Sequence, residues 1–183
     1  MFTLECLYYL RTMKYLMILA SIFSLFGCQT KAQTLQVSTI YTAPQQVTRE
    51  VPETGKQHTY TTYQEVTERF VPAVSLVSKE DKVLRFRIQG NIKSRGLQIR
   101  KVSKIRFEQG EQFGNGITLK YYVNIKHIAG KEGASIAGYN YSEEKEYRIP
   151  THVKVIHIEV YEEHPNQEPK LIAEKKFDFF AKI

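Results

Sequence analysis

Apolar and polar residues alternate with a period of two through most of the chain from Val71 onward. The clearest alternations cover residues 84–89, 117–126 and 156–161. Successive side chains of a β-strand point to opposite faces, so this pattern is typical of strands with one buried and one wet face. No long window shows the 3.6-residue apolar period of a capped helix. The sequence therefore predicts an all-β fold, an antiparallel two-sheet sandwich of about six to eight strands.

Two predicted strands carry an irregularity. In residues 97–107 the apolar positions change parity between Ile99 and Val102, which predicts a β-bulge near residues 100–103. Residues 171–180 show a similar parity slip around residues 174–176. Turn-forming residues separate the strands, and the predicted turns are Gly90-Asn91 with Arg95-Gly96, Gly110 with Gly114-Asn115-Gly116, and His164-Pro165-Asn166.

The Ile149-Pro150 step is followed by a predicted strand over residues 153–161. This arrangement resembles a corner of immunoglobulin-like and fibronectin-like domains, in which proline stops one strand before the next begins. The resemblance implies an immunoglobulin-like or fibronectin-like architecture. It covers about fifteen residues and lacks the cysteine pair and the tryptophan of true immunoglobulin domains.

The beginning of the chain has the organisation of an export signal. Lys14 precedes an apolar run over residues 15–26, which Gly27 and Cys28 follow. A basic residue holds the start of such a segment on the cytoplasmic side, and a small residue leaves room for a peptidase. Because a membrane-spanning helix needs about 20 apolar residues, the run is too short to remain in the bilayer as an anchor.

Residues 13–28 resemble the signal peptide and lipobox of bacterial lipoprotein precursors. Leu25 and Gly27 match that pattern, whereas Phe26 is bulkier than usual. The resemblance implies that Cys28 becomes the first mature residue and carries a lipid, which places the protein in the cell envelope. It would then face the periplasm or the exterior, on the outer membrane if the cell is Gram-negative. An ordinary secretory signal with a chance cysteine is the alternative.

Residues 1–12 fit a signal segment poorly because they include Glu5, and translation from Met13 would remove them together with Cys6. Once Cys28 is acylated, no thiol remains in the mature chain. Disulfides, thiolate metal sites and cysteine nucleophiles are then excluded.

Composition divides the chain into three parts: residues 1–28 as signal, residues 29–68 as a Thr- and Gln-rich tether, and residues 69–183 as the sandwich domain. A flexible segment of this kind would hold the domain clear of a membrane. Residues 35–41 alternate, however, and residues 59–66 are a run of β-forming residues. One or both stretches are therefore alternative candidates for edge strands.

Nine basic residues and no acidic residue occur between Lys82 and Phe107. If the two strands of this region formed one hairpin, several cations would share a solvent face and attract an anion. The candidate anion-binding residues are Arg85, Arg87, Lys93, Arg95, Arg100, Lys104 and Arg106. The alternative is a face neutralised by glutamates from later strands, such as residues 143–144 and 162–163.

Motifs for catalysis, cofactors or metals are not recognisable, and the five histidines are scattered. We therefore expect a membrane-tethered, non-catalytic protein that binds another envelope protein, an acidic glycan or a lipid headgroup. Nucleic acid is disfavoured because no aromatic RNA-binding motif is present. A glycan hydrolase of the envelope, with unidentified catalytic residues, is the alternative function.

Overall fold

The computed structural model describes residues 34–80, 82–94 and 97–179; Cys28, Arg95 and the whole predicted signal lie outside these residues. The described part is built from strands and turns. No helix within it could traverse a bilayer. The strands are β1 (Gln36–Glu50), β2 (Gln57–Glu65), β3 (Ala73–Glu80), β4 (Val83–Lys93), β5 (Gln98–Phe113), β6 (Gly116–Ala129), β7 (Ile136–Arg148), β8 (Val155–Glu163) and β9 (Lys170–Asp178).

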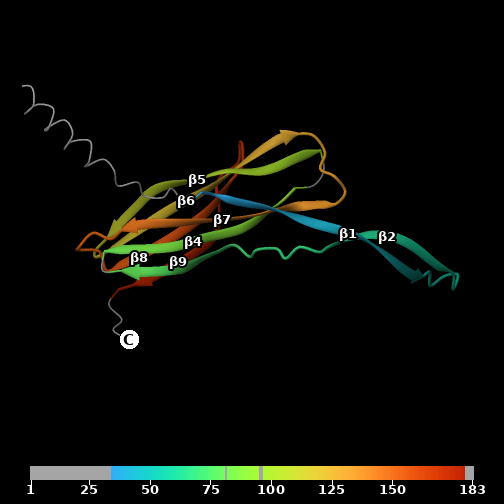
Figure 1. Cartoon of the computed structure of the whole chain (residues 1–183), viewed down its shortest axis with the longest axis horizontal. Helices are drawn as coiled ribbons and strands as arrows, with labels where there is room; N and C mark the ends of the chain where they lie inside the picture. The colour runs from blue at the N-terminus through green and yellow to red at the C-terminus, as the bar shows by residue number, and fades with distance from the viewer. Residues whose placement is uncertain (1–33, 81, 95–96, 180–183) are drawn as a thin grey trace, which may run out of the picture. The chain divides into compact units, whose positions relative to one another are not determined.

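The strands form two sheets that pack face to face (Figure 1). The five-stranded sheet has the order β2-β1-β7-β4-β3, and the four-stranded sheet has the order β5-β6-β8-β9. The predicted all-β, two-sheet architecture is therefore confirmed. One pairing differs from the antiparallel prediction, because β6 and β8 are parallel. The chain leaves the four-stranded sheet after β6, runs back as β7 in the other sheet, and returns as β8 in the direction of β6.

The core lies between the sheets and comes from the alternating positions. Phe86 and Ile88 of β4 and Leu119 of β6 are completely buried. The Phe86 ring meets the Tyr121 ring edge to face, with 5.6 Å between centroids and a 72° interplanar angle. Burying such apolar side chains is the main stabilising contribution to a fold of this kind, at about 1.5–3 kcal/mol for each large residue.

Most of the segment expected to be a tether is folded. β1 pairs through Gln36–Tyr41 with β7 inside the five-stranded sheet. From Thr42 to Glu50 it pairs with β2, so the alternating stretch (residues 35–41) and the run of β-forming residues (residues 59–66) both lie almost entirely in strands. Residues 29–33 of the expected tether lie outside the described residues. The sequence prediction underestimated β1 because its outer half has few apolar residues to mark a buried face.

The local irregularities agree with the sequence in part. The register of β5 and β6 shifts between Val102 and Lys104, which places a bulge at Ser103 as predicted. In β9 the shift lies opposite Val160 and Tyr161, between Leu171 and Ala173, and not at residues 174–176. Gly90 and Asn91 form no turn and lie within β4.

Gly90 stands in a strand because of what faces it. It pairs with Tyr141 of β7. A Cβ atom on Gly90 would lie 2.4 Å from the Tyr141 hydroxyl oxygen, so only glycine leaves room for this ring. Glycine inside a strand often marks such a close approach.

Asn91 and Asn140 pair across β4 and β7 and hold the segment that follows β2, here called the return segment (residues 66–72). Asn140 is buried; its amide donates to the Glu68 carbonyl (2.8 Å) and its oxygen accepts from the Phe70 N–H (2.9 Å). Asn91 donates to the Phe70 carbonyl (2.6 Å). The two side chains thus satisfy backbone groups that have no ladder partner.

Candidate functional site

The predicted cationic residues do not share one face. β4, with Arg85, Arg87 and Lys93, belongs to the five-stranded sheet, whereas β5, with Arg100, Lys104 and Arg106, belongs to the other sheet. The hairpin that would have gathered them is absent because β4 pairs with β3 and β7. Whether any of these residues binds an anion therefore depends on the surroundings of each group.

On the five-stranded sheet the arginines are neutralised by glutamates. Arg85 forms ion pairs with Glu146 (3.0 Å) and Glu80 (3.3 Å), and Arg87 pairs with Glu144 (2.5 Å). The hydrogen bond to Glu146, assisted by the charges of Glu146 and Glu80, raises the pKa of Arg85. This part of the surface follows the alternative in which the face neutralises itself.

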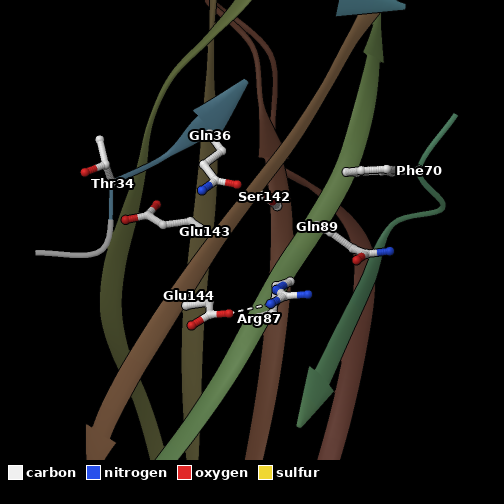
Figure 2. A pocket seen from close by; sticks show the side chains of 8 residues that line it. All are labelled: Thr34, Gln36, Phe70, Arg87, Gln89, Ser142, Glu143 and Glu144. Atoms are coloured by element: carbon white, nitrogen blue, oxygen red, sulfur yellow. Dashed lines mark hydrogen bonds and ion pairs between the residues drawn. The ribbon is translucent and has the colours of Figure 1, made fainter. Parts of the chain in front are cut away.

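A cavity of about 450 Å³ lies on this sheet. Figure 2 shows the side chains that line it. Its lining combines Arg87 with two carboxylates (Glu143 and Glu144), four neutral polar residues and one aromatic ring, namely Thr34, Gln36, Gln89, Ser142 and Phe70. The Arg87–Glu144 pair crosses the cavity wall, as the dashed line in Figure 2 indicates. Glu143 pairs in addition with Lys145 (2.5 Å). With two carboxylates around one paired arginine, this cavity is unsuited to an anion.

A larger groove of about 610 Å³ lies at one end of the four-stranded sheet. β5, β6, the last residue of β8 and the turn that follows β8 line this groove. The lining residues are Ser103, Lys104, Arg106, Asn124, Ile125, Lys126, Glu163, His164, Pro165, Asn166 and Gln167. Glu163 is engaged, because Asn124 donates to its carboxylate and Arg106 lies 3.6 Å from it. The lining thus contains three cations against one satisfied carboxylate.

Three lysines at this end of the sheet carry unneutralised charge. Within the described residues, Lys101, Lys104 and Lys126 form no ion pair. Lys101 of β5 and Lys126 of β6 are direct cross-strand partners. Like charges in directly opposed positions destabilise a sheet, and the contact that the described residues offer the Lys101 ammonium is the Tyr139 ring, whose centre lies 5.9 Å away. The three lysines and the groove form the candidate anion site.

Arg106 lines the groove and also packs on the first of two stacked tyrosine rings. Its guanidinium lies 4.2 Å from the centre of the Tyr122 ring, and that ring stacks on Tyr161 at 5.2 Å. Arg106 also forms an ion pair with Glu108 at 3.0 Å, and the hydrogen bond in this pair contributes most to raising the pKa of Arg106. Because the two faces of Tyr122 are occupied by Arg106 and Tyr161, this ring does not offer a free surface for stacking a sugar.

A histidine pair lies beside the groove. His127 Nε2 and His164 Nδ1 are 2.9 Å apart, and His164 Nε2 donates to the Glu162 carboxylate at 2.6 Å. In neutral His164 the Nδ1 atom is then an acceptor, so His127 donates to it. Burial, followed by the positive charges of His164 and Arg100, lowers the pKa of His127. His127, His164 and Glu162 are not arranged to hold a metal ion together, and the described residues contain no other group of three or more His, Cys, Asp or Glu side chains that could.

Sequence reasoning identified Lys104 and Arg106 but missed Lys126 and Asn124 as their neighbours. Both lie on polar positions of the alternation in β6, which is the signal that could have included them. Their neighbourhood to β5 depends on strand pairing. Arg100 is half-buried, and its Nε atom has no hydrogen-bond partner among the described residues. Lys93 ends β4, in the other sheet, and Arg95 lies outside the described residues.

Comparison with known proteins gives no family assignment: no protein-family description, no curated protein and no solved structure matches this chain.

Proposed function

We propose that this chain is a lipid-anchored protein of the cell envelope whose sandwich binds an anionic polymer, such as an acidic glycan, without catalysing a reaction. The observation that carries the proposal is the group of Lys101, Lys104 and Lys126, whose charges are not paired within the described residues, next to an open groove. A bound anion would relieve the repulsion between Lys101 and Lys126 and would find amide donors on Asn166 and Gln167.

The chemistry of the groove favours a polymer with repeated charges over a single small anion. Lys104 and Lys126 lie in exposed positions of two neighbouring strands, where each contact with an anion is worth little by itself. Several such contacts along an extended ligand add up, and their strength falls with ionic strength. A lipid headgroup or an acidic surface of another envelope protein has related chemistry but presents fewer charges in a line.

Membrane anchoring rests on the residues around Cys28. Gln36 already belongs to the five-stranded sheet, so seven residues (29–35) separate the proposed lipid on Cys28 from β1, and Gln36 lies eight residue steps after Cys28. An extended chain of this length spans at most about 29 Å. The sandwich would therefore stay close to the bilayer, and the long reach expected of a 40-residue tether does not apply. Two or three acyl chains on Cys28 would suffice for a stable anchor.

Retention on an immobilised polyanion tests the binding function. The full-length protein in detergent should bind at low salt, and Lys104→Ala with Lys126→Ala should weaken binding by about 0.4–2 kcal/mol, or about 2- to 30-fold. The matched control is Lys175→Ala with Lys176→Ala. This pair removes the same charge from two exposed positions of β9, the strand at the opposite edge of the sheet from β5. Equal losses in the two double variants would mean that net charge, and not the groove, causes retention.

Labelling cells with palmitate tests the anchor separately. The wild-type chain should incorporate the label and sediment with membranes, and Cys28→Ala should lose both properties. An unlabelled wild-type chain would remove the anchor from the proposal and leave the polyanion result unaffected.

The finer fold assignment and the enzymatic alternative remain hypotheses. An immunoglobulin-like or fibronectin-like architecture is supported by the corner at Pro150, whose carbonyl accepts from the Val153 N–H at 3.0 Å, but the parallel pairing of β6 and β8 is unlike the antiparallel sheets of those domains. A glycan hydrolase would need two carboxylates beside the scissile bond. The groove has Glu163 as its carboxylate, and Arg106 and Asn124 hold it.

A further inference from the structure

The outer half of β1 and the whole of β2 form a two-stranded ribbon, defined as residues 42–65 (Figure 1). Pairing of β1 with β7 ends at Tyr41, and β2 pairs with β1 alone. Nearly all side chains of β2 are exposed, and Thr62 is its half-buried exception. A ribbon of two strands is only marginally stable in water, and it presents unpaired backbone groups along its edges.

The hydrogen bonds at both ends of the ribbon show which backbone groups are free. The Val66 N–H donates to the Tyr41 carbonyl, and the Val51 N–H donates to the Lys56 carbonyl. Hydrogen-bonded and non-hydrogen-bonded pairs alternate along an antiparallel ladder. In the uninterrupted register between these two pairs, Thr59, Thr61 and Tyr63 therefore direct their N–H and C=O groups away from β1, toward the open edge of β2.

The two edges of the ribbon differ in their protection against further pairing. By the same alternation, Pro44 lies on the outer edge of β1, where it offers no N–H group. On β2 the stretch from His58 to Gln64 contains no proline and no Asp, Glu, Lys or Arg. Proteins usually block an exposed edge with such residues or with a bulge, and the β1–β2 register has no shift.

We propose that β2 pairs with β2 of a second copy of this chain, antiparallel and about a two-fold axis at Thr61. Thr61 is the middle residue of β2, so this register pairs all nine residues of the strand. It also brings the outward-directed groups of Thr59 opposite those of Tyr63 in the second copy, as an antiparallel ladder requires. The two ribbons together form a four-stranded sheet.

The side chains of β2 are complementary to themselves in this register. Thr59 faces Tyr63 of the second copy, and Tyr60 faces Thr62 of the second copy, which are aromatic and β-branched pairs of the kind that stabilise sheets. His58 faces Gln64, and Gln57 faces Glu65, so no like charges are opposed. Tyr60 and Tyr63 are 42% and 51% exposed in the single chain, and the pairing covers part of both rings. These pairings are related by the two-fold axis at Thr61, so they favour a second copy of β2 over a strand of another protein.

Cysteine crosslinking in cells that express the full-length chain tests the register. The axis places residue 61 opposite itself, so Thr61→Cys should yield a disulfide-linked dimer on oxidation. The matched control is Gln46→Cys, which is the cross-strand partner of Thr61 on the same ribbon but lies one strand farther from the open edge. The wild-type chain, oxidised in parallel, shows how much crosslinking comes from its own Cys6 and Cys28. Equal crosslinking of the two variants overturns the proposal.

A charge exchange tests the same axis without a covalent bond. In detergent, sedimentation of the full-length wild-type chain should show a concentration-dependent dimer. Thr61→Lys and Thr61→Glu should each lose the dimer, because each opposes like charges, and an equimolar mixture of the two should recover it. A wild-type chain that stays monomeric, including one that captures a different protein through β2, contradicts the proposal, as does a mixture that fails to dimerise.

Discussion

The sandwich and the ribbon have the same backbone hydrogen bonding but different side-chain environments. In β6 nearly every second residue is buried against the opposite sheet, whereas β2 has no buried residue. Ladder hydrogen bonds contribute little net free energy because water offers similar bonds, so the sandwich owes its stability mainly to the apolar surface it buries. The ribbon shows that a sequence of β-forming residues can make a strand that has no core of its own.

The sharpest test of this difference compares an apolar truncation in each region. Phe86→Ala should lower the free energy of unfolding by about 3–5 kcal/mol, because Phe86 is fully buried against Tyr121. Val47→Ala in the ribbon should cost about 0.5 kcal/mol or less. Urea denaturation measures both values. Similar losses would mean that the ribbon is packed as the sandwich is.

A second test adds atoms in place of removing them. Gly138 of β7 has φ of +154°, and a Cβ atom on it would lie 2.1 Å from the Ile92 carbonyl oxygen. Gly138→Ala should therefore cost about 2 kcal/mol or more, through backbone strain and overlap. The control is Gly133→Ala in the exposed connection before β7, where the nearest other group is the Ser135 hydroxyl at 3.9 Å. Thermal unfolding of both variants should separate them clearly; a tolerated Gly138→Ala would contradict the tight packing of β4 on β7.

The return segment joins the two regions and offers a third test. Asn140→Ala removes the bonds to Glu68 and Phe70 and should cost about 1–2 kcal/mol. Limited proteolysis should then cut residues 66–72 sooner than in the wild type, because the segment is no longer held on the sheet. Gln89→Ala, on the same outer face, shortens a polar side chain without touching these bonds and serves as the control. Unchanged cleavage in Asn140→Ala would show that other contacts hold the segment.

The smallest expected effect concerns pH. The pKa of His127 lies below its ordinary value of 6.5 in the folded chain, chiefly through burial. Below pH 6.5 the unfolded chain gains a proton that the folded chain resists, so stability present above this pH is lost as the pH falls through the folded pKa. The melting temperature should decrease when the pH is lowered from about 7.5 to about 5.5, and His127→Gln should make this decrease smaller. An identical pH dependence in the variant would assign the effect to other groups.

Some residues of the candidate anion site could be predicted from the local sequence pattern, and others depend on the pairing of distant strands. Lys104 and Arg106 were predictable, because their polar parity in the sequence already indicated an exposed face. Lys126 was not, because its place next to Lys101 depends on the register of β5 with β6. The neutralisation of Arg85 and Arg87 by Glu146 and Glu144 depends equally on the pairing of β4 with β7.

The sequence by itself determined the all-β class, the buried parity of β4, β6 and β8, and the bulge at Ser103, because side-chain alternation is a property of neighbouring residues. Only the tertiary structure decided which strands became partners. Gly90 and Asn91 have a strong local preference for a turn, yet they lie inside β4 because Tyr141 and Asn140 occupy the facing strand. Which strands pair depends on packing between residues far apart in the chain, and the local alternation of side chains does not contain this information.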